Sequence, residues 1–334
     1  MTVMRVGIDS YCLNPLKLDP VSILRWVSDR GGEGVQFSEV HPRDGRPVDE
    51  GLLREISSAA SASDMYLEWG GGEHVPFDTS SWQKKDLTEG NLRAAKQASA
   101  LGATVVRSCS GGFFRWSNEP PDTETLLAEM AKTLRPQRDA FEDLAVTLAI
   151  ELHFEFTTFE LLRLFESCDA EPGGWLGVCL DTFNMLPMLE DPVAGTARVL
   201  PWVVATHMKD GAVSLGPEGL VTFPTELGHG QVDMDAIVRL LESAPQQVNL
   251  SVEDHGGTFK TNIYDAEFMT RFPDLTGSEM GQLIKLAHDG TDLLSEARVR
   301  ATDRADWPPV CQQRTEAGVG FLKRLAENQS QRSD

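Results

Sequence analysis

The chain has 334 residues, enough for one large domain or two ordinary ones, and its composition of 41% hydrophobic and 24% charged residues is typical of globular proteins. The formal net charge of -21 argues against a phosphate backbone as partner, so we expect no binding to nucleic acid. No apolar run reaches the roughly 18 residues of a membrane span, and the five scattered cysteines contain no Cys-x-x-Cys pair. With an N-terminus that enters a strand almost at once, these features predict a cytoplasmic protein with free thiols and no membrane contact.

Eight short, mainly apolar β-type runs alternate with helical patterns along the chain. The helical stretches carry apolar residues three and four apart and often end at glycine. Short apolar strands suit a parallel sheet that is buried on both faces, so eight strand–helix units predict a (β/α)8 TIM barrel. An open doubly wound sheet is the alternative, but the first strand is followed by no G-x-G-x-x-G turn. The predicted strands cover residues 4–9, 34–39, 65–70, 103–110, 146–153, 177–181, 202–210 and 247–254.

Two parts of the chain fall outside the eight strand–helix units. We predict a catalytic barrel domain over residues 1–295 and a C-terminal helical extension over residues 296–334 with a frayed end. The segment over residues 256–290 carries several aromatic side chains and is much longer than an ordinary βα loop. We expect this segment to act as a lid or to bind a partner subunit. The aromatic loop over residues 111–116 could bind a sugar face or an aglycone, but we favour a subunit interface there, most simply in a homo-oligomer.

Chemically active side chains stand at the ends of the predicted strands, where a (β/α)8 barrel places its active site. Taken alone, a glutamate at a strand end is most often a helix cap or an ion-pair partner, and a single histidine is most often a buried structural residue. Strands are poor in Asp and Glu, so a whole series of such ends is unexpected. In chain order the ends are Asp9, Glu39, Glu68, Arg107, Glu151, Asp181, His207 and Glu253.

The last four strand ends predict a divalent metal site. Glu151, Asp181, His207 and Glu253 belong to consecutive strands and would converge at one side of the barrel mouth. Three carboxylates so close together would repel one another unless a cation neutralised them. Three carboxylates and one imidazole form a hard set of oxygen and nitrogen donors, which suits Mn²⁺ first and leaves Mg²⁺, Co²⁺, Zn²⁺ and Fe²⁺ as alternatives.

In order and spacing these four residues resemble the metal quartet of the xylose isomerase-like barrel superfamily. Their local sequences are IELH, CLDTFN, THMKD and SVEDHG, and LGHGQVDMDAIVRLL over residues 227–241 resembles the stretch between strands seven and eight of these proteins. The resemblance covers residues 4–255 and implies a TIM barrel that acts on a sugar-derived small molecule. Members of the superfamily include sugar isomerases and epimerases, inosose dehydratase, decarboxylases, keto-glycoside lyases and endonuclease IV-type repair enzymes.

The resemblance implies that the cation grips a carbonyl or hydroxyl oxygen of a keto-sugar or polyol-derived substrate and stabilises an enediolate. Reprotonation would then give an isomerase or epimerase, whereas expulsion of a group from the β-carbon would give a lyase; decarboxylation reaches the same kind of intermediate from the other direction. Ketose 3-epimerases of the superfamily carry a His three residues after the metal Asp and an Arg six after the metal His. Here these positions are Asn184 and Val213. Their absence favours lyase chemistry (3-keto-glycoside cleavage by β-elimination, dehydration or decarboxylation), with an isomerase or epimerase as the alternative.

Proton transfer is assigned to residues at the metal edge. Glu151, Glu253, His153 and Lys209 are the predicted catalytic residues. Lys209 lies two residues beyond His207 and would point to the same face if the strand continues. The HxKD pattern resembles that of inosose dehydratase and the lyase-type relatives, while a plain ion pair between Lys209 and a strand-end acid is the alternative.

A further set of residues is predicted to bind the substrate. Arg107 could anchor an oxyanion or neutralise a neighbouring strand-end acid, and Trp69 and Trp116 offer aromatic faces in βα loops. His255, two residues beyond Glu253, is either a proton carrier or a support for the glutamate. The complete set is Arg107, Glu68, Trp69, Trp116, Asn184 and His255.

Two other classes of function fit the sequence less well. An apurinic-site endonuclease of the endonuclease IV type would need a many-histidine, multi-zinc site and affinity for DNA, but the chain has seven histidines, one of them in the quartet, and a net charge of -21. A barrel that has lost catalysis and serves as a binding subunit is disfavoured because all four ligands are present.

Overall fold

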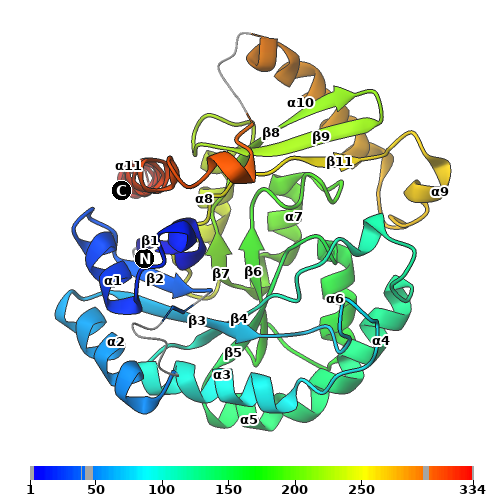
Figure 1. The fold of residues 1–334 in the computed structure, drawn as a ribbon. Helices are drawn as coiled ribbons and strands as arrows, with labels where there is room; N and C mark the ends of the chain where they lie inside the picture. Colours follow the sequence, from blue (N-terminus) through cyan, green and yellow to red (C-terminus); the bar gives the residue numbers. More distant parts are fainter. Residues whose placement is uncertain (1–3, 39, 42–47, 296–300, 333–334) are drawn as a thin grey trace.

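Eight parallel strands form a barrel inside a ring of helices in the computed structural model, which describes residues 4–38, 40–41, 48–295 and 301–332 (Figure 1). The barrel strands are β1 (Val6–Asp9), β2 (Gly34–Phe37), β3 (Tyr66–Gly72), β4 (Val105–Ser108), β5 (Thr147–Glu151), β6 (Leu176–Asp181), β7 (Val203–His207) and β10 (Leu250–Val252). Neighbours in the sheet run from β10 through β1 to β7. A parallel bridge between Met208 and Val252 joins the two ends of this order. The predicted TIM barrel is confirmed, with each strand inside or within one or two residues of its predicted range.

The barrel strands are covered by helices that follow them in the chain. Many begin at an aspartate whose carboxylate accepts a backbone N–H of the first turn, which accounts for several of the acidic residues. These caps are Asp19, Asp49, Asp122, Asp191 and Asp233. The helices are α1 (Pro20–Ser28), α2 (Glu50–Ala62), α3 (Thr88–Leu101), α4 (Thr123–Leu134), α5 (Arg138–Asp143), α6 (Thr158–Ser167), α7 (Pro192–Val199), α8 (Met234–Glu242), α9 (Ala266–Met269), α10 (Gly277–Ser295) and α11 (Cys311–Arg332).

A three-stranded antiparallel sheet beside the barrel was not predicted. It consists of β8 (Asp210–Gly216), β9 (Gly219–Thr225) and β11 (Phe259–Thr261), in the order β11-β9-β8. The β8–β9 hairpin turns at Pro217 and Glu218, between two runs of alternating apolar residues, so the sequence did contain a hairpin signal. The segment over residues 256–290 is therefore largely regular structure, since it supplies β11, α9 and much of α10, and α10 packs against β8 (Figure 1).

The C-terminal helix α11 packs against β1, β10 and α8. Its side chains reach back to the barrel: Gln312 accepts from the Trp26 indole at 2.9 Å, and Arg314 lies 2.8 Å from Asp254. The predicted division at residue 295 falls between α10 and α11. The predicted fraying concerns the end of the chain, and its last two residues lie outside the described part.

All five cysteines are free thiols. Among the described residues, no helix combines the length and the apolar character needed to cross a lipid bilayer.

Candidate metal centre

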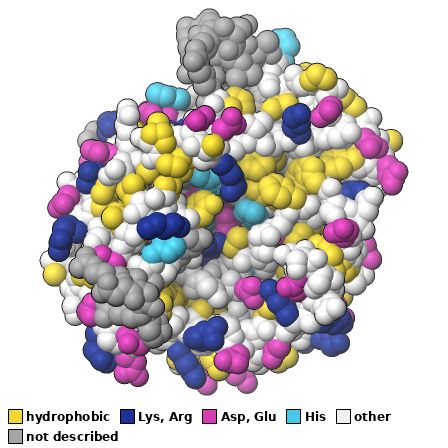
Figure 2. Space-filling view, viewed as in Figure 1, with side chains coloured by type: hydrophobic (Ala, Val, Ile, Leu, Met, Phe, Trp, Pro, Cys, Tyr) yellow, Lys and Arg dark blue, Asp and Glu magenta, His cyan; other side chains and the backbone are white. Residues whose placement is uncertain are grey.

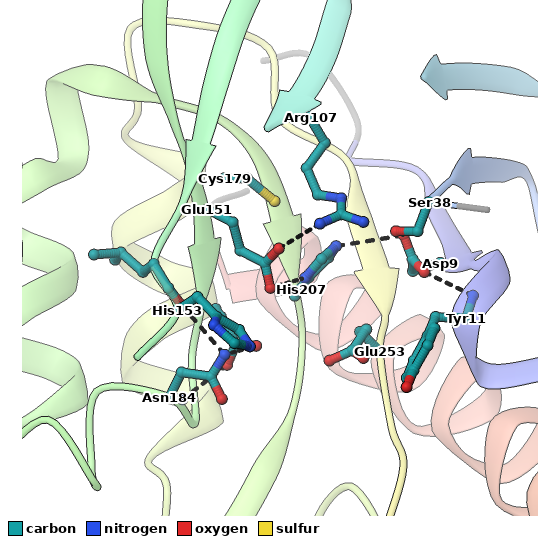
Figure 3. A network of polar contacts seen from close by, with 12 residues as sticks. Asp9, Tyr11, Ser38, Arg107, Glu151, His153, Cys179, Asn184, His207 and Glu253 are labelled. Atoms are coloured by element: carbon teal, nitrogen blue, oxygen red, sulfur yellow. Dashed lines mark hydrogen bonds and ion pairs between the residues drawn. The ribbon is translucent and has the colours of Figure 1, made fainter. Parts of the chain in front are cut away.

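Three of the predicted metal ligands lie together at the C-terminal ends of neighbouring strands. Glu151 ends β5, Asp181 ends β6 and His207 ends β7, and all three side chains are buried. One ligand atom from each lies within 4.8 Å of the other two. Figure 3 shows the Glu151 carboxylate and the His207 ring turned toward one another inside the barrel. Small side-chain movements would let one cation contact all three donors.

The fourth predicted ligand, Glu253, is joined to this group through Lys209. The Lys209 ammonium lies 2.9 Å from Asp181 Oδ2 and also contacts Glu253 Oε2. Burial disfavours a charged lysine, but the two carboxylates raise the pKa of Lys209 above its ordinary value. Burial likewise opposes ionisation of Glu253, yet Lys209 and His255 lower its pKa to about 2. The ion pair considered for Lys209 is thus present, and it joins two predicted ligands.

Arg107 neutralises the first predicted ligand, Glu151. Its Nη1 lies 2.6 Å from Glu151 Oε2, with both side chains largely buried (Figure 3). Burial opposes ionisation of Glu151, but Arg107 and His207 hold its pKa well below the usual range. Of the two roles predicted for Arg107, the structure contains the pairing with an acid.

Asp181 is held in place by the residues that follow it. Its Oδ1 accepts the backbone N–H groups of Phe183 at 2.9 Å and Asn184 at 2.8 Å, and its Oδ2 accepts the Asn184 amide at 2.8 Å. Burial raises the pKa of this carboxyl group. Asn184, predicted to bind substrate, therefore orients a predicted metal ligand, and its position three residues after a strand end was the signal for that role.

The His207 ring is contacted on both nitrogens. Nδ1 lies 3.2 Å from Glu151 Oε1, while Nε2 contacts Gln36 Oε1 and lies 3.4 Å from Asp9 Oδ2. Asp9 is fixed in turn by the backbone N–H of Tyr11 at 2.7 Å (Figure 3). The histidine is thus oriented by groups from β1 and β2, across the barrel from β5.

Glu68 does not reach the barrel mouth, contrary to its predicted place in the substrate site. It accepts from Gln36 Nε2 at 2.7 Å and from Asn249 Nδ2 at 3.1 Å, and burial raises its pKa to about 7. Together with Arg5 and Tyr66 it lines a cavity of about 720 Å³ at the N-terminal ends of the strands. The prediction failed because β3 is longer than expected: Glu68 lies four residues before its end, so the side chain sits deep inside the barrel.

The two predicted proton carriers lie at the edge of the centre. His153 Nδ1 is 3.1 Å from Glu155, whose carboxylate raises the pKa of His153 against the effect of burial. His255 Nε2 is 3.3 Å from Lys209 Nζ and 3.5 Å from Glu253, and burial together with Lys209 lowers its pKa to about 4. Both rings remain partly exposed, at 22% and 12% of the side chain. Each can therefore meet a molecule in the barrel mouth.

Trp69 lies away from the centre, so its predicted stacking on a substrate is wrong. Side chains of a strand alternate between its two faces. Glu68 points into the barrel, and Trp69 therefore points outward, where its indole donates to Gln97 of α3 at 3.1 Å and its ring packs on Phe37. The ring is buried, at 3% exposure.

Aromatic rings form a wall beside the centre. Phe154 packs 4.3 Å from the His153 ring, and Phe113 stacks on Phe154 at 5.0 Å. Trp116 lies edge-on to Phe113 and donates to the Lys260 carbonyl at 2.7 Å, so the predicted aromatic loop and the 256–290 segment contact each other. Figure 2 shows a hollow in this face with histidine and acidic side chains on its floor and apolar side chains along one side.

Two residues near the centre escaped the sequence reasoning. Gln36 carries no charge and lies inside β2 rather than at its end, so it was not among the strand-end residues considered. His74 follows β3, is fully buried, and shares a 2.8 Å hydrogen bond between Nδ1 and Ser108 Oγ. Glu39, at the end of the second predicted strand, lies outside the described residues.

The last residue of the HMKD motif has a structural task. Asp210 accepts backbone N–H groups from Gly228 at 3.0 Å, Gly230 at 2.9 Å and Val232 at 3.2 Å. It thereby fixes the LGHGQV turn before α8, and a Cβ at Gly230 would lie 2.1 Å from the carboxylate. The HMKD motif and the LGHGQV turn are therefore joined through the Asp210 carboxylate.

Comparison with known proteins agrees with this architecture. The chain is 27% identical over 273 residues to the 3-oxo-isoapionate decarboxylase of Pectobacterium atrosepticum, covering 75% of this chain and 85% of that protein. Among solved structures, an L-ribulose 3-epimerase is similar with a TM-score of 0.56, 20% identity, and 88% and 95% coverage of this chain and that one. A xylose isomerase-like protein from Mycobacterium smegmatis in complex with magnesium gives a TM-score of 0.58, 15% identity, and 86% and 100% coverage. Residues 24–271 match the family model described as the xylose isomerase-like TIM barrel, and the chain belongs to that family.

Proposed function

We propose that this chain is a divalent-metal-dependent enzyme that acts on a keto-sugar or polyol-derived substrate through an enediolate, with lyase chemistry favoured. The observation that carries the proposal is the buried group of Glu151, Asp181 and His207 at the barrel mouth, with Lys209 and Glu253 beside it. The 27% identity to a decarboxylase supports the choice of a lyase.

The donor set fits a divalent cation. Glu151, Asp181, His207 and Glu253 would hold it, because three carboxylates and an imidazole match the preferences of Mn²⁺ first and of Mg²⁺, Co²⁺, Zn²⁺ or Fe²⁺ as alternatives. A bound cation would supply Lewis acidity toward a substrate oxygen.

The residues of the chain supply charge and proton transfer. The Lys209 ammonium can donate to a carboxylate or to a developing oxyanion of the substrate, since it already holds two acids in the same place. His153, oriented by Glu155, and His255, beside Lys209, stand at the exposed edge where they can take or give a proton. Glu151 and Glu253 are further candidates for this transfer.

The surroundings of two residues favour a lyase over a ketose epimerase. Asn184 uses its amide to hold Asp181, and Val213 is fully buried in β8. Neither can bind the oxygens of a ketose as the histidine and arginine at the resembling positions are expected to do. Phe113, which stacks on Phe154 next to His153, is exposed and offers an apolar face to a group other than a small free sugar.

An assay of the Mn²⁺-loaded protein tests the proposal. The substrates are sugar-derived 3-oxo acids, 3-keto-glycosides, inososes and free ketoses, and the readouts are CO₂ release, elimination products and deuterium uptake from D₂O. We expect CO₂ or an eliminated group from one of the first three classes, and none after removal of the metal by a chelator. Deuterium exchange and interconversion of free ketoses, without elimination or CO₂, would instead establish the isomerase alternative.

A further inference from the structure

We infer that Gln36, held in one orientation by Glu68, sets the tautomer of His207 so that Nδ1 is the ring nitrogen that faces the cation. Gln36 is then a positioning residue of the metal centre, although it lies on β2, far in sequence from every ligand. The inference rests on the metal centre of the proposed function and is independent of the choice between lyase and isomerase.

The first step concerns the orientation of the Gln36 amide. Glu68 accepts from Gln36 Nε2 at 2.7 Å on one oxygen and from Asn249 Nδ2 at 3.1 Å on the other. Both oxygens of Glu68 thus serve as acceptors of amide N–H groups, so the nitrogen of the Gln36 amide faces Glu68 and its oxygen faces the opposite way. Gln36 and Glu68 are buried, at 0% and 2% exposure, so bulk solvent has little access to these bonds.

The second step concerns the histidine. The amide oxygen of Gln36 contacts His207 Nε2, and Asp9 Oδ2 lies 3.4 Å from the same nitrogen. Two acceptors at one ring nitrogen hold a proton there, so a ring that gives up one proton to bind a cation frees the lone pair of the other nitrogen. That nitrogen, Nδ1, is 3.2 Å from Glu151 Oε1 and so faces the group of ligands.

The third step is the effect on the metal. A hydrogen bond to the second ring nitrogen fixes both the tautomer and the ring orientation of a metal-binding histidine. Gln36 is the main acceptor for the proton on His207 Nε2, because Asp9 Oδ2 is 3.4 Å from that nitrogen and already accepts from Ser38. The other oxygen of Asp9 accepts the Tyr11 N–H at 2.7 Å. Without Glu68 the Gln36 amide is free to turn its NH₂ group toward Nε2, and that arrangement favours the proton on Nδ1, where it blocks the cation.

The experiment compares Gln36→Leu, Glu68→Leu and Glu68→Gln in the full-length protein. Titration with Mn²⁺ gives the dissociation constant, and the proton–nitrogen NMR spectrum of the histidines in the Zn²⁺-loaded protein gives the tautomer of His207. We expect the dissociation constant to rise about 10- to 100-fold in Gln36→Leu and Glu68→Leu. Glu68→Gln should stay near the native value, because its side-chain oxygen still accepts from Gln36.

The control variant is Gln97→Leu, which removes an amide that bonds Trp69 outside the barrel. Thermal unfolding without metal separates a loss of folding from a loss of affinity. Unchanged Mn²⁺ affinity in both leucine variants, or a proton on His207 Nδ1 in the loaded native protein, would overturn the inference. Failure of the native protein to bind Mn²⁺ would instead overturn the metal centre, and the inference with it.

Discussion

Replacing Lys209 with Met should make the stability of the protein depend on a divalent cation. Lys209 is 2% exposed and its ammonium contacts both Asp181 and Glu253, which are themselves buried. Methionine fills nearly the same space without the charge, so two carboxylates are left facing each other with no cation between them. A bound metal ion would neutralise both and remove most of the penalty.

The size of the effect can be worked out from these contacts. Removing one partner of a buried ion pair typically costs about 3–5 kcal/mol. Unfolding entropy of about 2.1 cal/mol/K per residue gives about 0.7 kcal/mol/K for 334 residues, so the melting temperature should fall by about 4–7 °C. Free Mn²⁺ at about 100 times its dissociation constant adds about 2.7 kcal/mol to a native state that binds it, and the variant should gain at least as much as the native protein.

Differential scanning calorimetry with Mn²⁺ and with a chelator measures both quantities. Lys85→Met is the matched control, because Lys85 pairs with Glu73 at 2.8 Å but both side chains are partly exposed, and such a pair contributes less than about 1 kcal/mol. An unchanged melting temperature of Lys209→Met in the chelator would refute the charge argument. A melting temperature of Lys209→Met that does not rise when Mn²⁺ is added would do the same for the role of the metal.

Three further predictions address other parts of the barrel. Arg107→Met should cost the metal-free protein about 3–5 kcal/mol, because it removes the guanidinium that lies 2.6 Å from the buried Glu151 carboxylate. Urea unfolding measures this loss; part of it should be recovered when Mn²⁺ is added, and equal losses with and without Mn²⁺ would contradict the prediction. Burial lowers the pKa of His74 from 6.5 to about 4, so between these pH values only the unfolded chain binds the proton. The contribution of the neutral His74 to the free energy of unfolding is therefore present above pH 6.5 and lost as the pH falls. By about pH 4 the native protein should lose about 3 kcal/mol more of this free energy than His74→Phe, and parallel curves of stability against pH for the two proteins would refute this. A Cβ at Gly7 would lie 2.2 Å from the Gly34 carbonyl oxygen, so Gly7→Ala should melt well below Gly277→Ala, whose Cβ meets open space; similar melting temperatures would show that the barrel adjusts.

The barrel itself could be predicted because its signals are local. A short apolar run followed by an amphipathic stretch ending in glycine indicates one strand–helix unit, and eight repeats of that pattern leave few alternatives. The β8–β9 hairpin was missed because it interrupts this repeat between the seventh strand and its helix. The position of α11 against β1 and β10 depends on contacts between the two ends of the chain, which no local pattern contains.

By itself the sequence placed four chemically active side chains at the C-terminal ends of consecutive barrel strands: Glu151, Asp181, His207 and Glu253. This was possible because the end of a strand can be recognised locally and because the side chains of a strand alternate between its two faces. Only the tertiary structure decided which charges meet. It placed Lys209 between two acids from strands on either side of His207, and it set the amide of Gln36 against the ring of that histidine. The physical reason is closure of the barrel: Gln36 and His207, which are 171 positions apart in the chain, become hydrogen-bond partners, and their orientation is fixed by the burial that closure imposes.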